Sequence, residues 1–273
     1  MTIILVIVLL TAILILKVSK RGRTRIDCRS FFSGAPFAHR GAFIPGFIPE
    51  NSLSAFDRAC TLGYGIELDV RAARDGRLCV MHDRNIQRMT GCDAFVESLD
   101  LKALKAYHLD GTEETIPSLS EALKVIAGRV PIIIEMKSNG FHERPDRMAE
   151  LLVSEMKNYH GSWCAESFDP RILSAFKQLK PSVPIGQLSE PQPLWPIGPW
   201  LHGKLLCCLI SRPDFIAYRI GSSVPHWLKI KKQGLPLIAW TVHSKNEWKQ
   251  VKKVYDAYIF EGFLPCKDTD EIE

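Results

Sequence analysis

The chain has 273 residues and a mass of 30.8 kDa, enough for one large α/β domain or two small ones. With 46% apolar and 24% charged residues, it has the composition of a globular protein with a substantial core. The net charge of +5 comes almost entirely from one segment, residues 17–29. Its only acidic residue is Asp27, and its basic residues are Lys17, Lys20, Arg21, Arg23, Arg25 and Arg29. Because the remainder is close to neutral, we expect no nucleic-acid partner.

The cysteines show no C-x-x-C spacing, and several lie inside apolar runs; they are residues 28, 60, 79, 92, 164, 207, 208 and 266. This pattern argues against a zinc knuckle and against a disulfide framework. It indicates buried free thiols in a reducing compartment.

The amino terminus begins with an apolar run over residues 3–16, interrupted only by Thr11, and Lys17 starts the basic cluster. As a helix this run spans about 21 Å, short of the roughly 30 Å hydrocarbon core, but its flanking residues extend it. A signal peptide is not favoured, because the charge follows the apolar run and no small-x-small cleavage site is present. We therefore predict a single transmembrane anchor over residues 1–18.

The positive-inside rule then predicts a single-pass protein of the cell (inner) membrane, with the body of the chain facing the cytoplasm. Residues 19–34 should form a basic, irregular linker. This linker either lies along anionic headgroups or is a solvated tether without lipid preference. Residues 35–273 should form one folded domain.

An antiparallel hairpin arm is expected after the second strand. The first strand is predicted over 36–39 and the second over 65–70, with a helix capped by Asn51 or Ser52 between them. Only seven residues separate Val70 from Leu78, too few for a crossover helix, and Asp75-Gly76 marks a tight turn. Residues 78–82 should therefore return along strand 65–70 and carry His82 over its carboxyl end.

The rest of the chain mostly alternates strands and helices. Residues 84–118 read as polar and loop-like with a helical turn or two, and 204–210 fits helix or strand equally well. The other predicted elements are helices over 119–127, 144–159, 170–179, 226–233 and 245–254, and strands over 130–136, 163–168, 184–188, 214–218, 237–242 and 257–260. Eight strands besides the hairpin arm, with no Gly-rich dinucleotide turn, predict an α/β fold, a closed (β/α)8 TIM barrel.

Chemically capable side chains cluster at predicted strand ends, where the active sites of such barrels lie. Glu67 and Asp69 are two residues apart, so both point to one side of their strand, and Glu135 should join them from the adjacent barrel strand. Neighbouring carboxylates repel unless a proton or a cation lies between them. Three hard oxygen ligands without cysteine favour one divalent cation, Mg²⁺ or Ca²⁺, over zinc.

Two histidines and two cations complete this cluster. His39 and His82 have ordinary pKa values near neutrality and suit general acid/base work. Arg40 offers a planar fork to a phosphoryl group, and Lys137 points where Glu135 points. Each alone has a structural alternative, such as a salt-bridged rim or a solvated lysine; the convergence of all of them favours a phosphodiesterase site.

A series of motifs carries a family resemblance over about residues 36–262. They are His39-Arg40-Gly41, Pro49-Glu50-Asn51-Ser52, Glu67-Leu68-Asp69-Val70, Asp75-Gly76, His82-Asp83, Arg88-Met89-Thr90-Gly91, Ile116-Pro117-Ser118-Leu119, Glu135-Met136-Lys137, Ser167-Phe168-Asp169 and Trp240-Thr241-Val242. The set resembles the glycerophosphodiester phosphodiesterase family, in a membrane-anchored, bacterial-type form. Any one motif is weak, but the set is highly specific.

The resemblance implies a metal-dependent barrel that hydrolyses glycerophosphodiesters to an alcohol and glycerol 3-phosphate. It assigns acid/base catalysis to His39 and His82, metal binding to Glu67, Asp69 and Glu135, and phosphate binding to Arg40 and Lys137. The implied reaction is attack on phosphorus by the substrate's neighbouring hydroxyl, followed by hydrolysis of a cyclic phosphate. Glu50 is expected to orient Arg40 or the metal shell, and Trp240 lies at the rim or in the core.

Two departures from the family pattern, His243 and Glu261, fall on the expected site rim and concern headgroup preference. No large substrate-capping insertion separates His82 from Glu135, and an open mouth beside a membrane anchor suits a lysophospholipid. The alternatives are therefore lysophospholipase D- or C-type hydrolysis on the same site, or a non-catalytic membrane-anchored barrel that binds phosphodiesters. The alcohol and the oligomeric state stay open.

Overall fold

Eight parallel strands close into a barrel in this computed structural model, which describes residues 25–34, 36–139, 144–190, 207–221 and 235–265. Closure is direct, because the first strand pairs with both the second and the last. In barrel order the strands are β1 (Phe37–Ala38), β2 (Gly65–Ala72), β4 (Ile132–Met136), β5 (Trp163–Ser167), β6 (Ile185–Ser189), β7 (Phe215–Arg219), β8 (Leu237–Val242) and β9 (Ala257–Phe260). The predicted (β/α)8 barrel is confirmed.

The predicted hairpin arm is present. Strand β3 (Leu78–Val80) runs antiparallel to β2, with Val70 opposite Val80 and Ala72 opposite Leu78. The turn passes through Gly76, whose φ of 79° lies in the left-handed region that glycine tolerates best. This arm runs back from the carboxyl end of β2 to the level of Asp69, whose backbone oxygen accepts from Met81 N at 3.0 Å, and His82 follows.

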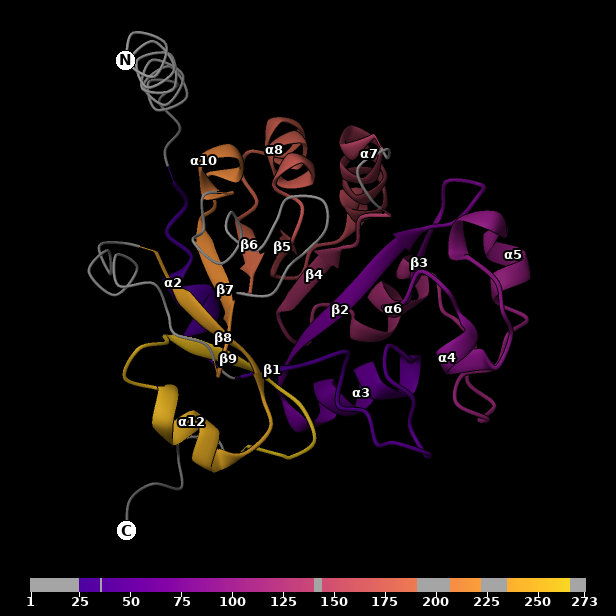
Figure 1. Ribbon diagram of the computed structural model, residues 1–273, viewed down its shortest axis with the longest axis horizontal. Helices are drawn as coiled ribbons and strands as arrows, with labels where there is room; N and C mark the ends of the chain where they lie inside the picture. Colours follow the sequence, from indigo (N-terminus) through magenta and orange to yellow (C-terminus); the bar gives the residue numbers. More distant parts are fainter. Residues whose placement is uncertain (1–24, 35, 140–143, 191–206, 222–234, 266–273) are drawn as a thin grey trace, which may run out of the picture.

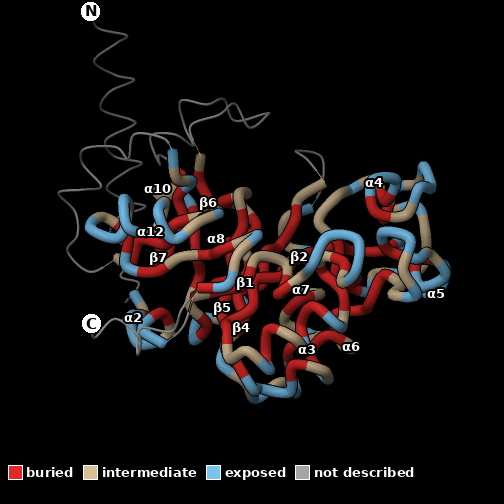
Figure 2. The backbone as a smooth tube through the Cα atoms, turned by 90° about the horizontal axis from the view of Figure 1, so that it is seen from below, coloured by how far each residue is buried: buried red, intermediate tan, exposed pale blue. Residues whose placement is uncertain are grey.

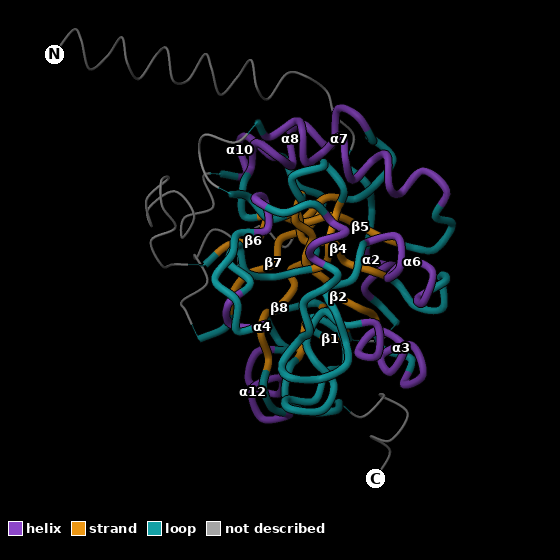
Figure 3. Tube along the Cα trace, turned by 90° about the vertical axis from the view of Figure 1, so that its right-hand side faces the viewer, coloured by secondary structure: helices purple, strands orange, loops and turns teal. Residues whose placement is uncertain are grey.

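Helices surround the strands, as Figures 1 and 3 show. The longer ones are α3 (Leu53–Leu62), α6 (Leu119–Ile126), α7 (Pro145–Glu155), α8 (Pro170–Leu179) and α12 (Lys245–Val251). A one-turn helix, α10 (Cys208–Ser211), lies in the run that fitted helix or strand. The predicted helix over 226–233 lies outside the described residues.

The strands alternate their side chains between two apolar clusters, and Figure 2 shows the burial that results. On β4, Ile132 and Ile134 belong to the cluster under the helices, whereas Ile133 belongs to the cluster inside the barrel. Phe37 and Phe215 also lie in the inner cluster. The lower barrel is thus a packed apolar core, which leaves only the upper end for chemistry.

Residues 84–118, predicted as polar and loop-like with a helical turn or two, form a small lobe with its own core. Three short helices shape it: α4 (Gln87–Thr90), the 3-10 turn η1 (Val96–Ser98) and α5 (Leu101–Leu104). Ile86, Leu104 and other buried apolar residues of this segment pack together here with Met81, which precedes it. The apolar residues are spaced too irregularly for one amphipathic helix, so the sequence concealed this core.

The expected irregular linker ends in a structured segment under the barrel. Helix α2 (Arg29–Phe32) packs Phe32 against Phe215, with ring centroids 4.8 Å apart, and Ile26 N donates to Asp214 Oδ1 at 2.9 Å. The predicted anchor over residues 1–18 lies outside the described residues. Within the residues that are described, no helix is long and apolar enough to cross a membrane.

The described cysteines are free thiols, and five of the seven are buried: Cys28, Cys60, Cys79, Cys164 and Cys207. Burial raises the pKa of Cys79 to about 12, so this thiol stays protonated and unreactive.

Candidate active site

The three predicted metal ligands meet at the carboxyl end of the barrel. Asp69 on β2 lies beside Glu135 on β4 in the strand register, and Glu67 precedes Asp69 by two residues. One carboxylate oxygen from each lies within 4.8 Å of the others, and all three side chains are buried. The strand period and the parallel register therefore bring together the residues that the sequence singled out.

Lys137 lies inside this carboxylate cluster, with only 9% of its surface exposed. Its Nζ is 2.9 Å from Asp69 Oδ1 and 2.8 Å from Glu135 Oε2. Burial alone would lower the pKa of Lys137, but Asp69 and Glu135 raise it above its ordinary value. Burial opposes the charge on Asp69 too, yet Lys137 holds the pKa of that carboxyl well below its usual range. This pair is therefore charged.

Glu67 shows that the cluster lacks positive charge. Burial, with repulsion from Asp69 and Glu135, raises the pKa of Glu67 well above its usual range. A divalent cation between these oxygens would relieve that repulsion. Buried, hard oxygen donors without sulfur fit Mg²⁺ or Ca²⁺, so the residues present suit the metal that the sequence predicted.

His39 follows β1 and forms a short pair with an acidic residue. Its Nδ1 is 2.5 Å from Glu261 Oε2, and its Nε2 lies 3.9 Å from Glu67 Oε2. The sequence predicted a rim position for Glu261; the structure places it on the histidine instead. Burial lowers the pKa of His39 despite Glu261, so the ring is neutral near pH 7, with Nε2 turned toward the carboxylates.

His82 has the same kind of partner. Its Nδ1 is 2.6 Å from Asp83 Oδ1, and its backbone oxygen accepts a bond of 2.8 Å from Arg71 Nε. Asp83 Oδ2 in turn accepts from Arg88 Nε at 2.5 Å. The hydrogen bond to His82 is the largest cause that lowers the pKa of Asp83 below its usual range, and the bond to Arg88 lowers it further. The hairpin thus delivers a second oriented histidine.

Arg88 connects this histidine to the predicted phosphate ligand. Its Nη2 donates to Glu50 Oε1 at 2.6 Å, and the same oxygen accepts from Arg40 Nη1 at 2.8 Å. Arg40 Nε lies 3.5 Å from Asp69 Oδ2. Glu50 therefore holds both Arg40 and Arg88, and the sequence analysis did not single out Arg88 as a site residue. Its family motif, Arg88-Met89-Thr90-Gly91, was the available signal.

Asn51 was expected only as a helix cap, but its side chain supports the metal site. Its Nδ2 donates to Asp69 Oδ2 at 2.8 Å, while Ser52 caps α3 by accepting from Ala55 N. Asn51 has a φ of 56°, in the left-handed region that asparagine tolerates better than most residues. Backbone Arg40 N likewise donates to Glu67 Oε2 at 3.1 Å. The loop after β1 thus holds two of the three candidate metal ligands, Glu67 and Asp69.

The remaining predicted rim residues are Trp240 and His243. Trp240 is half-buried and packs edge-on against Phe168 at 5.6 Å between ring centroids. His243 is exposed, and its backbone N donates to Glu247 Oε2 at 2.6 Å. Neither contacts the catalytic pairs through a hydrogen bond that the structure records.

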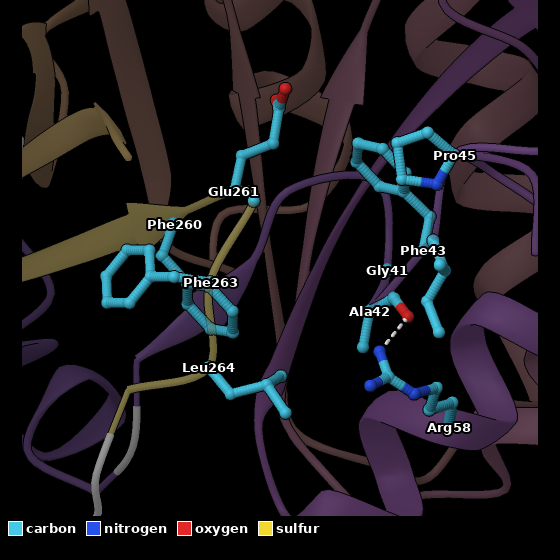
Figure 4. A pocket seen from close by; sticks show the side chains of 11 residues that line it. Gly41, Ala42, Phe43, Pro45, Arg58, Phe260, Glu261, Phe263 and Leu264 are labelled. Carbon is cyan, nitrogen blue, oxygen red and sulfur yellow. Dashed lines mark hydrogen bonds between the residues drawn. The ribbon is translucent and has the colours of Figure 1, made fainter. Parts of the chain in front are cut away.

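A pocket of about 180 Å³ is lined in part by Glu261, the residue that pairs with His39. Figure 4 shows Phe263 and Leu264 on one wall facing Ala42 and Arg58 on the other, with the Glu261 carboxylate directed away from them. Phe43, Ile44 and Pro45 complete its apolar lining. Ile44 and Leu264 are 36% and 45% exposed, so the pocket opens to solvent along apolar edges.

Comparison with known proteins gives one consistent result. Residues 39–259 match the model of the glycerophosphoryl diester phosphodiesterase family. The chain is 32% identical over 228 residues to a glycerophosphodiester phosphodiesterase of Caldanaerobacter subterraneus, covering 79% of this chain and 88% of that protein. It is 31% identical over 142 residues to a lysophospholipase D of Rattus norvegicus, covering 47% and 44%.

Among solved structures, an Oleispira antarctica phosphodiesterase in complex with the product sn-glycerol-3-phosphate aligns with a TM-score of 0.71. The alignment covers 85% of this chain and 94% of that chain at 24% identity. The two proteins therefore share the barrel fold.

Proposed function

Because this chain belongs to the glycerophosphoryl diester phosphodiesterase family, we propose that it hydrolyses glycerophosphodiesters to an alcohol and glycerol 3-phosphate. One observation carries the proposal: a buried carboxylate trio and two carboxylate-paired histidines share one end of the barrel. A non-catalytic barrel would have no need for two oriented histidines beside a cation site.

We assign the first proton transfer to His39. Glu261 holds its Nδ1, so the neutral ring presents Nε2 to the substrate's neighbouring hydroxyl and accepts its proton. That oxygen then attacks phosphorus, and the bond from phosphorus to the leaving alcohol breaks. His82, oriented by Asp83, donates a proton to the leaving oxygen. Water opens the resulting cyclic phosphate with the two histidines in exchanged roles.

Glu67, Asp69 and Glu135 would hold one divalent cation, Mg²⁺ or Ca²⁺, which supplies positive charge for the equatorial phosphoryl oxygens. Arg40 and Lys137 add positive charge from the chain itself. Glu50 fixes Arg40 in place through a bond of 2.8 Å. The Arg40 and Lys137 side chains both lie beside Asp69, so both can interact with an anionic substrate bound at this end of the barrel.

A product-resolved assay of the full chain tests this function. Glycerophosphocholine or glycerophosphoethanolamine should give the free alcohol and glycerol 3-phosphate, and a chelator should abolish turnover until Mg²⁺ or Ca²⁺ is restored. His39→Ala and Glu67→Ala should both be inactive, whereas His160→Ala, which removes an exposed histidine, should retain full activity. Turnover that survives these two changes would show that the assigned site is wrong.

The pocket beside Glu261 favours a second candidate substrate, a lysophospholipid. Its apolar lining and exposed edges suit an acyl chain next to His39, and Phe47, 80% exposed, lies in the same tight turn as Ile44. Lysophosphatidic acid as product would identify this activity, whereas glycerol 3-phosphate identifies the first. Ile44→Asp should then reduce lysophospholipid turnover and leave glycerophosphodiester turnover unchanged.

We also propose that residues 1–18 anchor the enzyme in the cell membrane, with residues 19–34 as linker and the barrel of residues 35–273 in the cytoplasm. The apolar run followed by six cationic residues supports this orientation. Cell fractionation should place the full chain with membranes and a chain lacking residues 1–18 in the soluble fraction. Protease added outside intact spheroplasts should leave the barrel uncut.

A further inference from the structure

A fourth carboxylate, Glu166, lies on the inner face of the barrel next to the metal site. On β5 the side chains alternate: Cys164 belongs to the inner apolar cluster, Ala165 to the outer one, and Glu166 therefore points inward. Glu166 is the register partner of Glu135, which is the partner of Asp69. Three adjacent strands thus place a carboxylate at the same level of the barrel.

The environment of Glu166 leaves its charge uncompensated. The residue is 1% exposed, and its Oε2 is buried with no hydrogen-bond partner among the described residues. Burial and then repulsion from Glu135 raise its pKa well above the usual range, and Glu166 contributes to the raised pKa of Glu67. Burying a carboxylate oxygen without a hydrogen-bond partner reduces the stability of the fold. A bound ligand that interacts with this oxygen would offset that cost.

The charges nearby identify the kind of ligand. Glu67, Asp69, Glu135 and Glu166 are four buried carboxylates, and Lys137 is the lysine among them. Arg40 is shared between Asp69 and Glu50, and Glu50 also pairs with Arg88. The carboxyl groups outnumber the cations in this cluster, so it attracts a further cation. A fourth carboxylate would strengthen the binding of a cation, whereas it would gain nothing from an anionic phosphate.

We propose that Glu166 is a fourth carboxylate of the cation site, which faces the cation from β5 and raises its affinity without being one of the three ligands. The proposal rests on the cation site of the proposed function. Carboxylates beside a metal's ligands commonly change metal affinity by about 10- to 100-fold when removed. Affinity for hard cations also rises with the number of carboxylates that surround them.

Isothermal titration calorimetry of the full chain with Ca²⁺, Mg²⁺ and Mn²⁺ tests the proposal without turnover. Glu166→Gln should weaken cation binding about tenfold or more, and Glu150→Gln, which removes an exposed carboxylate on α7, should leave it unchanged. Without metal, Glu166→Gln should unfold at the same temperature as the wild type or higher, because a buried, repelled charge is gone. A merely structural glutamate would instead lower the unfolding temperature.

The affinity for glycerol 3-phosphate separates this role from the closest alternative. If Glu166 were instead a protonated donor to the phosphate, Glu166→Met would weaken product binding, because methionine cannot donate, and the cation affinity of Glu166→Gln would stay intact; that result would overturn the proposal. So would cation affinities within twofold of the wild type. Glu135→Gln distinguishes a failure of this proposal from a failure of the proposed function. If Glu135→Gln and Glu166→Gln both bind cations normally, the proposed cation site itself is wrong. If only Glu135→Gln binds cations more weakly, the cation site stands and the role of Glu166 is refuted.

Discussion

Two buried charge clusters lie at opposite ends of the barrel, and they differ in how completely their charges are satisfied. At the bottom, Lys177 Nζ lies 2.6 Å from Asp214 Oδ2 and also donates to Val183 O. The carboxylate accepts further bonds from the backbone of Ile26 and Ile185. One cation faces one anion, and neighbouring backbone groups complete their hydrogen bonds.

At the mouth, Lys137 faces several carboxylates, and the pKa values of Glu67 and Glu166 are raised well above their usual range. Both clusters are buried, so burial alone does not distinguish a structural cluster from a functional one. The balance of charge distinguishes them. A matched ion pair holds strands together, whereas a cluster with excess carboxylates favours the binding of a cation.

The largest effect is expected at the mouth. His82→Ala should lower kcat/KM for a glycerophosphodiester by about 10²- to 10⁴-fold, because the leaving alcohol loses its proton donor. A substrate with a nitrophenolate leaving group needs no such donor and should recover most of the lost rate. Equal losses on both substrates would assign His82 a role other than that acid.

The two lysines provide a direct contrast between the clusters. Lys177→Met should reduce the free energy of unfolding by about 3–5 kcal/mol, since the buried Asp214 carboxylate loses its only cationic partner among the hydrogen bonds named above. Lys137→Met should also destabilise the metal-free protein, but excess Ca²⁺ or Mg²⁺ should restore its stability by replacing the lost charge. Chemical denaturation with and without the cation measures the free energy of unfolding of both variants. If the cation also restored the stability of Lys177→Met, the two clusters would not differ in the way described.

Glu261→Gln should have a smaller effect, about tenfold on kcat/KM at its plateau, through the loss of a charged hydrogen bond to His39. The pKa of His39 is already lowered by burial, and Glu261 opposes that shift. Removing the charge should lower this pKa further and move the acidic limb of the pH–rate profile to lower pH. A limb that moves to higher pH would exclude the pairing.

An exposed charge pair outside both clusters should matter least. Glu121 forms a capping box with Ser118 at the start of α6 and also bonds Lys105. Although partial burial opposes the charge, these contacts lower its pKa from 4.5 to about 2. Its stabilisation is therefore present above pH 4.5 and disappears as the pH falls through about 2. Glu121→Gln should cost about 0.5–1 kcal/mol at pH 7 by thermal unfolding, and little at pH 2.

The sequence predicted correctly the features that depend on the local periodicity of the chain, such as the side of a strand on which a side chain lies. Eight strand segments predicted the barrel, and the two-residue spacing of Glu67 and Asp69 predicted their common side. The Asp75-Gly76 turn predicted the antiparallel arm that brings His82 to the site. These features depend on neighbours along the chain, so they can be read without knowing what packs against them.

Other features depend on contacts between distant segments. Glu261 and His39 are 222 residues apart in sequence, and their pairing follows only from β9 closing the barrel against β1. The core of residues 84–118 was concealed because its apolar residues follow no single period. Glu166 lies beside Glu135 only through the register of β4 and β5, which are separate segments of the chain.

The sequence by itself determined which residue types are available and on which side of each strand they point, because strand alternation is local. The tertiary structure decided which of them share a site and which lack a partner, because barrel closure and register bring strands together across the whole chain. Charge balance is a property of that assembled neighbourhood. For this reason the sequence predicted the carboxylate trio, whereas only the fold revealed the Glu261–His39 pair, the link through Arg88 and the fourth carboxylate at Glu166.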